Sequence, residues 1–289
     1  MISSAELSRA ACCNLGESFV TNPSVDVSYS DAATGAKQIK LLGLSGTYVQ
    51  MLTENIPNYR GAAAPYGLGY VPGPWMQSIQ VSKGTSSVKN GYEAITGQIN
   101  VEFKKPQLPE ADWVSANLFA STTNRYEANA DATLKLSKRW STSLLAHYEN
   151  ETKAHDGNDD GFVDIPQVEQ YNVWNRWAYM GDHYVFQAGI KALSETRTSG
   201  QANHGGTMHS GDLYKVGIDT ERHEFFTKNA YIFNKEKNTN LALILSTTLH
   251  NQDATYGRKL YNVDQTNVYA SLMFETEFNP QNSFSIIST

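Results

Sequence analysis

Hydrophobic and polar residues alternate along most of the chain that follows Pro109. In the stretch 126–136, for example, every second residue is apolar. The apolar positions are Tyr126, Ala128, Ala130, Ala132, Leu134 and Leu136, and the polar positions are Glu127, Asn129, Asp131, Thr133 and Lys135. The stretches 140–151, 241–249 and 267–275 repeat the pattern, and 222–234 follows it less regularly. A period of two predicts β-strands that have one apolar face and one polar face.

These predicted strands are about 10–14 residues long, whereas strands in soluble sheets usually have about 5–6 residues. A strand that crosses the hydrocarbon of a membrane at a tilt needs about 9–11 residues. Trp140 and Tyr148 bracket one apolar face, at a spacing that suits the two aromatic girdles of a barrel wall. The pattern therefore favours a transmembrane antiparallel β-barrel over a secreted β-sandwich.

The predicted connections alternate in length along the chain, apart from a tight first hairpin at 122–124. The short links are 137–139, 181–183, 234–240 and 279–282, and the long polar loops are about 153–170, 199–221 and 253–264. Outer-membrane barrels have short periplasmic turns and long external loops. A soluble sandwich has no reason to sort its loops in this way, so the connections favour the barrel too.

The first part of the chain has a different pattern, in which glycine and proline recur every few residues up to Pro109. Such residues interrupt long elements and predict a compact α+β unit with short strands and tight loops. We expect strands at 78–82 and 97–103 and a short helix between Ser4 and Phe19. Two units therefore follow one another, with the change of pattern near 104–109.

Composition narrows the functional classes. The net charge is −6 and the chain has no basic block, so a nucleic-acid partner is disfavoured. The longest aliphatic run is 241–245, far short of the roughly 20 apolar residues of a membrane-spanning helix. The sequence has no nucleophile elbow, no zinc-protease motif and no dinucleotide fingerprint, which argues against an enzyme.

The junction between the two units resembles a known family. It reads as a strand, 79–83, a turn at Gly84, a stretch of small residues, 86–91, and a second strand that begins Ile95-Thr96-Gly97-Gln98-Ile99-Asn100. This is similar to the end of the plug domain of TonB-dependent outer-membrane receptors, just before their barrel. The segments 43–46 and 55–57 resemble other plug elements, and the opening, 11–15 and 22–25, resembles plugs of Bacteroidetes members.

The resemblance implies a plug domain at 1–108 and a partial outer-membrane β-barrel at 109–289. Because a receptor barrel has about 22 strands, the eight or nine expected here imply a fragment that begins inside the plug. The resemblance to TonB-dependent receptors further implies energy-coupled import across the bacterial outer membrane, with the TonB complex as partner. The implied cargo is a scarce ligand, such as a ferric siderophore or another metal complex. No bond is made or broken in such import, so the implied protein is a transporter.

One loop has the spacing of a calcium site. Oxygen ligands stand at relative positions 1, 3, 5 and 9 and a glycine at position 6, as in the first part of an EF-hand loop. The residues are Asp156, Asn158, Asp160, the carbonyl of Phe162, and Asp164. The final bidentate glutamate is replaced by Gln167, so we expect at most weak Ca²⁺ binding, and a solvated acidic loop is the simpler alternative.

Two other groups of residues suit soft metals. His204, Met208 and His209 lie in the second long loop, and imidazole and thioether are ligands of copper. Cys12 and Cys13 are adjacent and offer no disulfide framework. Stray histidines in a glycine-rich loop, and two small cysteines buried beneath a helix, are the ordinary explanations.

Two other classes of protein remain open from the sequence. A secreted β-rich adhesin or carbohydrate-binding module would also alternate, but it would lack an apolar belt. A passive porin would have the belt, but it would lack the glycine-rich N-terminal unit. The sequence thus predicts a mainly β protein with an α+β plug and an incomplete barrel.

Overall fold

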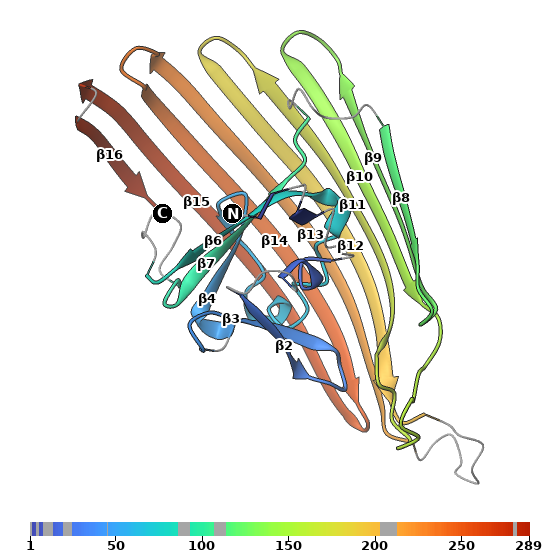
Figure 1. The fold of residues 1–289 in the computed structure, drawn as a ribbon. Helices are drawn as coiled ribbons and strands as arrows, with labels where there is room; N and C mark the ends of the chain where they lie inside the picture. Colours follow the sequence, from blue (N-terminus) through green and yellow to red (C-terminus); the bar gives the residue numbers. More distant parts are fainter. Residues whose placement is uncertain are drawn as a thin grey trace.

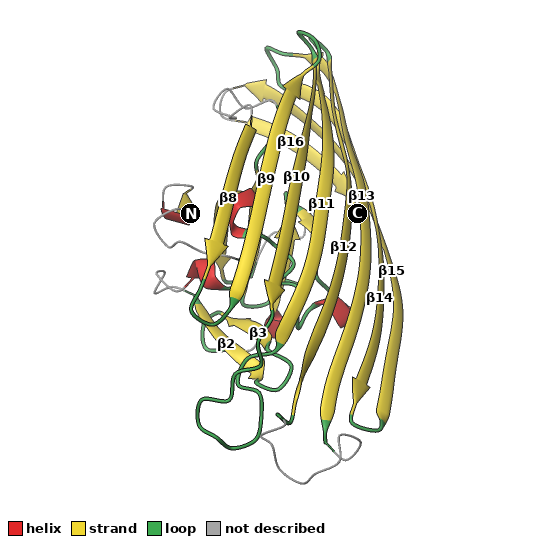
Figure 2. Ribbon diagram, turned by 90° about the vertical axis from the view of Figure 1, so that its right-hand side faces the viewer, coloured by secondary structure: helices red, strands yellow, loops and turns green. Residues whose placement is uncertain are grey.

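The alternating part of the chain folds as one antiparallel sheet. The computed structural model describes residues 2–3, 6–7, 14–19, 25–44, 46–85, 93–106, 114–202, 213–279 and 282–289. Within these ranges, nine strands pair strictly in chain order, and the sheet is strongly curved (Figures 1 and 2). They are β8 (Val114–Ala120), β9 (Arg125–Lys135), β10 (Trp140–Glu151), β11 (Gln167–Met180), β12 (Tyr184–Gly200), β13 (Lys215–Asn234), β14 (Thr239–Tyr256), β15 (Lys259–Asn279) and β16 (Asn282–Ser288). We call this the curved sheet.

The preceding residues form a smaller unit, which we call the N-terminal unit. Its main sheet has the order β1-β6-β7-β4-β5, and β2 and β3 form a separate hairpin. The strands are β1 (Ile2–Ser3), β2 (Asp26–Asp31), β3 (Ala36–Lys40), β4 (Val49–Thr53), β5 (Ile56–Pro57), β6 (Met76–Lys83) and β7 (Gly97–Phe103). Short 3-10 helices cover Glu17–Phe19, Gly46–Tyr48, Gly61–Ala63 and Gly73–Trp75. The unit lies against the concave face of the curved sheet (Figure 1).

These observations confirm the predicted fold class. The chain is mainly β, the N-terminal unit precedes long barrel-like strands, and the curved sheet does not close on itself. Among the described residues, none of the helices has the length and apolar character that crossing a membrane would require. The predicted domain boundary at residue 108 falls at 107–113, outside the described residues, and stays a prediction.

The two ends of the curved sheet differ. Turns such as 136–139 and 181–183 lie at one end, the short-turn end, at the top of Figure 1. The loop 152–166 lies at the other, the long-loop end, where β12 also ends and β13 begins. Exposed and half-buried aromatic side chains pack together at the short-turn end, where the ring centroids of Trp140 and Tyr179 are 5.1 Å apart. The next ring pair, Tyr148 and Tyr171, is 4.9 Å apart towards the long-loop end.

Two sequence predictions about this sheet are wrong. β12–β15 have 17, 20, 18 and 21 residues, more than the 10–14 expected. The predicted long loop 253–264 is a tight turn at Gly257-Arg258, because β14 and β15 stay paired from Asn240–Glu275 to Tyr256–Lys259. The cause is that residues beyond Leu249 on the outer face are polar, so paired strand there has the composition of a loop.

The predicted helix between Ser4 and Phe19 is not continuous. Asn14 forms a β-bridge with Pro72, and only Glu17–Phe19 is helical at that end. Residues 8–13 lie outside the described residues. The strands predicted at 78–82 and 97–103 are confirmed as β6 and β7.

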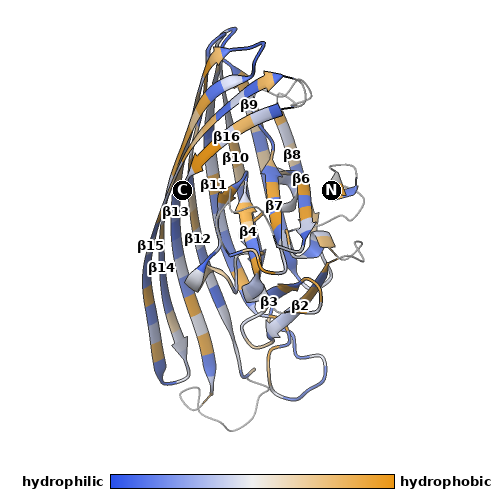
Figure 3. Cartoon of the chain, turned by 90° about the vertical axis from the view of Figure 1, so that its left-hand side faces the viewer, coloured by the Kyte–Doolittle hydropathy of each residue, from blue (hydrophilic) through white to orange (hydrophobic). Residues whose placement is uncertain are grey.

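The hydrophobic core lies mainly within the N-terminal unit and extends to the inner face of the curved sheet. Hydrophobic and hydrophilic residues alternate along the long strands (Figure 3), and the polar face turns towards the N-terminal unit. Leu145, which breaks the alternation of β10, is buried on this inner face together with Trp174 of β11. The ring of Trp174 packs edge-on against Phe103, at a centroid distance of 4.6 Å, and 6.3 Å from Trp75. Trp75 is fully buried, as expected of a core residue.

Candidate functional site

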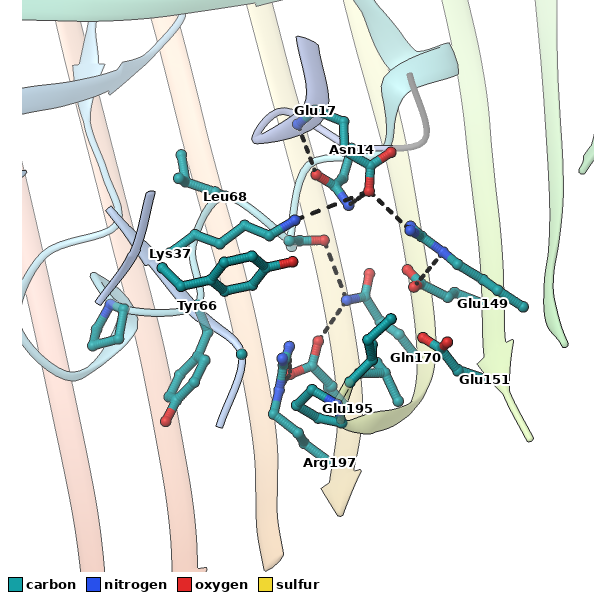
Figure 4. Close-up of a pocket in the computed structure, with 18 of the residues that line it drawn as sticks. Asn14, Glu17, Lys37, Tyr66, Leu68, Glu149, Glu151, Gln170, Glu195 and Arg197 are labelled. Atoms are coloured by element: carbon teal, nitrogen blue, oxygen red, sulfur yellow. Dashed lines mark hydrogen bonds and ion pairs between the residues drawn. The ribbon is translucent and has the colours of Figure 1, made fainter. Parts of the chain in front are cut away.

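A cavity of about 280 Å³ lies between the N-terminal unit and the curved sheet, towards the long-loop end (Figure 4). One wall comes from the segment around Glu17, from β3 and from 65–69. The other comes from β9–β12 and from the loop 152–166. The charged and amide side chains around it are Asn14, Glu17, Lys37, Arg125, Glu149, Glu151, Gln170, Glu195 and Arg197. The cavity is therefore polar and shared by both units.

The period of two explains why so many charges point into the cavity. Residues directly opposite on neighbouring strands share a face, and Glu149 of β10 faces Gln170 of β11. Gln170 in turn faces Glu195 of β12. Since the inner face of the sheet is the polar face, these side chains form one row across three strands.

Arg125 ties the two units together. Its Nη1 lies 2.8 Å from Oε1 of Glu17 in the N-terminal unit. Its Nη2 lies 2.7 Å from Glu127, and its Nε lies 3.0 Å from Glu149. One guanidinium thus meets three carboxylates, which neutralises a cation that the cavity would otherwise offer to an anion.

Arg197 makes a second connection between the units. Its guanidinium lies 3.0 Å from Glu195 on the same strand, and Nη1 donates to the carbonyl of Thr34 in the β2–β3 turn. The ring of Tyr66 lies 5.0 Å from the guanidinium carbon, a cation–π distance. Gln170 donates to Glu195 and to the carbonyl of Gly69.

Lys37 is the third cation at the cavity. Burial lowers the pKa of its ammonium group, and the carboxylate of Glu17, 4.0 Å away, opposes that shift. Like Arg125 and Arg197, Lys37 therefore lies next to a carboxylate of the protein itself.

A second polar contact between the units lies at Glu54. Its carboxylate is 2.7 Å from Nη2 of Arg176 on β11, and both side chains are 2% exposed. Lys228 of β13 lies 3.6 Å from the same carboxylate and donates to the backbone carbonyl of Glu54. Burial alone would raise the pKa of Glu54, but Arg176 and then Lys228 hold it below its ordinary value. The group is therefore a buried carboxylate anion held between two cations.

A third contact surrounds Asn58. Its amide nitrogen donates to Glu224 of β13 at 2.9 Å, and its amide oxygen accepts from Arg222. Arg222 and Lys191 also approach Glu224, at 2.8 and 3.6 Å. Charged groups from β12 and β13 thus hold the N-terminal unit at a further point, whose residues do not line the cavity.

The predicted calcium loop lies beside the cavity, which Ile165 and Pro166 help to line. Its acids accept hydrogen bonds from the loop's own backbone: Asp156 from the N–H of Gly161 at 2.8 Å, and Asp164 from the N–H of Gly157 at 2.7 Å. Among the described residues, no group of three or more histidine, cysteine or acidic side chains is arranged to hold a metal ion. Calcium binding at this loop stays a prediction.

The other predicted metal ligands fall outside the described residues. His204, Met208 and His209 belong to 203–212, and Cys12 and Cys13 belong to 8–13. Their roles stay predictions.

The cavity itself was not predicted from the sequence. The alternation of the strands predicts that Glu127, Asp131, Glu149 and Arg176 share the inner face, and the resemblance to plug-containing barrels implies that such residues would contact the plug or line the ligand path. The structure adds Arg125, Gln170, Glu195 and Arg197 to that face. The sequence did contain a signal for the cavity. Near the long-loop ends of neighbouring strands, charged residues occupy the alternate positions that face inward.

The comparisons with known proteins agree with this arrangement. Residues 1–98 match the family model described as the TonB-dependent Receptor Plug Domain. A search of curated proteins gives no match. Among solved structures, the chain is similar to the alcaligin outer membrane receptor FauA from Bordetella pertussis, with 12% identity and a TM-score of 0.67 over 96% of this chain and 43% of that one.

Two further structures have the same fold. The ferric-catecholate import receptor Fiu from E. coli K12 is 16% identical, with a TM-score of 0.66 over 95% of this chain and 44% of that one. The siderophore receptor PiuA from Acinetobacter baumannii is 13% identical, with a TM-score of 0.65 over 95% and 41%. The chain thus spans less than half the length of these receptors. Residues 1–98 are thus similar to the plug domain of TonB-dependent receptors, and the described chain has the fold of such a receptor's plug and part of its barrel.

Proposed function

We propose that this chain is part of an energy-coupled, TonB-dependent receptor that imports a scarce ligand across the bacterial outer membrane. The plug domain would occupy 1–108 and the barrel part 109–289. The observation that carries the proposal is the plug seated on the polar, concave face of a barrel-like sheet, with a cavity at the long-loop end. The similar receptors named above are described by their siderophores, which favours a ferric siderophore or another metal complex as cargo.

The proposed mechanism involves binding and movement, with no chemical conversion. A ligand would enter from the long-loop end and contact both units at the cavity. Force from the inner-membrane TonB complex would then displace the plug and break its contacts at Glu54, Asn58 and Arg125. These contacts are polar and discrete, so each can break and form again, and the same movement would separate the ring of Trp174 from Phe103 and Trp75.

Uptake by cells that carry the full-length receptor tests this function. The probes are ⁵⁵Fe complexes of a linear tris-hydroxamate and of a tris-catecholate. We expect uptake of at least one complex, and we expect it to stop in cells that lack TonB or after the proton-motive force is collapsed. Uptake that persists in both conditions would indicate a passive porin. A water-soluble protein with no detergent requirement would indicate the secreted adhesin instead.

We also propose that the loop at 156–164 binds Ca²⁺ weakly and orders one rim of the cavity. The loop offers Asp156, Asn158 and Asp160 at alternate positions, which is the spacing that converges on a hard cation. Because the final bidentate glutamate is missing, we expect a Kd of about 10⁻⁴–10⁻³ M, as in extracellular modules.

Calorimetric titration of the full-length receptor with CaCl₂ tests the calcium proposal. We expect Asp156→Asn to weaken binding about tenfold or more, because position 1 contributes a charged ligand. Asp159→Asn is the matched control, since position 4 is not a ligand position and asparagine tolerates its left-handed backbone, at φ 57°. Equal effects of the two substitutions would show that the loop acts only through its overall charge.

A further inference from the structure

The cations of the cavity are already paired within the protein. Arg125 meets Glu17, Glu127 and Glu149, Arg197 meets Glu195, and Lys37 lies near Glu17. Four carboxylates and three cations line the cavity, so its walls carry a small negative excess. An anionic ligand would therefore have to compete with these carboxylates for every cation.

Glu151 is the exception among the acids. It is the last residue of β10, it lines the cavity, and it is only 6% exposed. It stands directly opposite Arg125 in the β9–β10 pairing, but that guanidinium is directed at three other carboxylates. Within the part of the chain that the structure describes, no side chain or backbone group donates a hydrogen bond to Glu151 or forms an ion pair with it. The Glu151 carboxylate thus faces the cavity without a hydrogen-bond donor of its own, so a ligand group that supplies one gains affinity.

A second acceptor lies on the next strand. Gln170 uses its amide nitrogen to donate to Gly69 and Glu195, and its Oε1 is buried without a donor among the described residues. In the β10–β11 pairing Gln170 faces Glu149, which places it diagonally from Glu151 on the same inner face. Both groups are hydrogen-bond acceptors, and neither receives a hydrogen bond from the described residues. This side of the cavity therefore favours a ligand group that donates hydrogen bonds.

We propose that this cavity recognises a protonated amine of the imported ligand, with Glu151 as its counter-ion. The inference rests on the proposed import function and names the charge class of its substrate. An alkylammonium group supplies positive charge and three donors on a narrow stem. A cavity of about 280 Å³ is at the lower end of ligand sites, so it suits one amine-bearing arm of a larger complex. Polyanionic complexes are correspondingly disfavoured.

A matched pair of probes isolates the amine. One is a linear tris-hydroxamate iron(III) complex with a free terminal ammonium, and the other is the same complex with that amine acetylated. The two have identical metal coordination and differ by one positive charge. Binding to the full-length receptor in detergent is measured by calorimetry, with a calcium chelator present so that the neighbouring loop stays metal-free.

We expect the ammonium form to bind the unmodified receptor about tenfold or more tightly than the acetylated form, the effect of one charge-assisted hydrogen bond. Glu151→Gln should erase this ratio, because the amide keeps the shape and removes the charge. Glu221→Gln is the matched control, an exposed acid on the outer face of β13, and should leave the ratio unchanged.

Three results would overturn the proposal: equal affinities in the unmodified receptor, a ratio that survives Glu151→Gln, or no binding of either complex. The import function fails in a different way. If the ammonium complex binds through Glu151 but its uptake ignores TonB, the function is wrong and the recognition stands. If uptake depends on TonB but ignores acetylation, the recognition is wrong and the function stands.

Discussion

Alanine in place of Glu54 is expected to lower the free energy of unfolding of the N-terminal unit packed on the curved sheet by about 3–5 kcal/mol. The substitution leaves Arg176, which is 2% exposed, without its carboxylate, and it also removes the partner of Lys228. Breaking a buried ion pair from one side is costly because the remaining charge stays in a poorly solvated place. Urea unfolding of the full-length receptor in detergent measures the change.

The exposed pair Arg139–Asp182 is the control for this substitution. Its two side chains are 56% and 71% exposed, although its 2.8 Å distance matches that of the buried pair closely. Solvent screening makes such surface pairs nearly neutral, so Asp182→Ala should leave the unfolding curve unchanged. Similar losses from both substitutions would show that burial of the Glu54 pair does not matter.

The pH dependence gives an independent check on Glu54. Its pKa in the folded protein lies below the ordinary value of 4.5, so its contribution to stability is complete above that value and is lost as the pH falls through the folded pKa. Glu54→Gln should therefore destabilise by a constant amount from roughly pH 5 to pH 8. Below about pH 4.5 the difference from the unmodified receptor should shrink.

Alanine at Gly97 is expected to destabilise the plug by at least about 2 kcal/mol. Gly97 begins β7 with φ at +155°, and a Cβ built there would lie 2.2 Å from the carbonyl oxygen of Ser82 on β6. Either the β6–β7 pairing must open or the strand must shift, and both disturb the centre of the plug sheet. Thermal unfolding of the full-length receptor, followed by near-ultraviolet circular dichroism, measures the loss.

Gly217→Ala is the matched control for this glycine. Gly217 lies within β13, its φ is not positive, and a Cβ there meets no atom within 4 Å. Alanine should be neutral or slightly stabilising at that position because it reduces the freedom of the unfolded chain. An equally harmful effect at both positions would contradict the steric explanation for Gly97.

Much of the fold could be predicted because the period of two is a local property. The alternation in 126–136 and 140–151 fixes which side chains share a face, and the structure places the polar face inward. The same reasoning failed at 253–264, where Asp253 and Thr255 face outward beyond the last leucine of β14. Hydropathy cannot distinguish a strand that is exposed to solvent from a loop. The hydrogen bonds that pair two strands join backbone groups, so they do not require particular types of residue.

The cavity could not be predicted because its contacts join distant parts of the chain. Arg125 and Glu17 are 108 residues apart, and Arg197 and Thr34 are 163 apart. Alternation indicates that Glu149 and Glu151 point inward, but only the plug decides which of them finds a partner. The resemblance at 79–101 predicted that the chain has two units, but it could not predict which residues of the two units contact each other.

The unusual length of the central strands has a consequence for how the protein meets its surroundings. On β14 the outward leucines end at Leu249, and the paired strand continues to Tyr256. At about 3.3 Å per residue and a tilt of about 45°, those residues raise the rim by about 16 Å. In an outer-membrane receptor this rim stands among the sugars of the outer leaflet as rigid, hydrogen-bonded sheet. It offers proteases little slack backbone to cut, so digestion of intact cells should spare the Gly257-Arg258 hairpin.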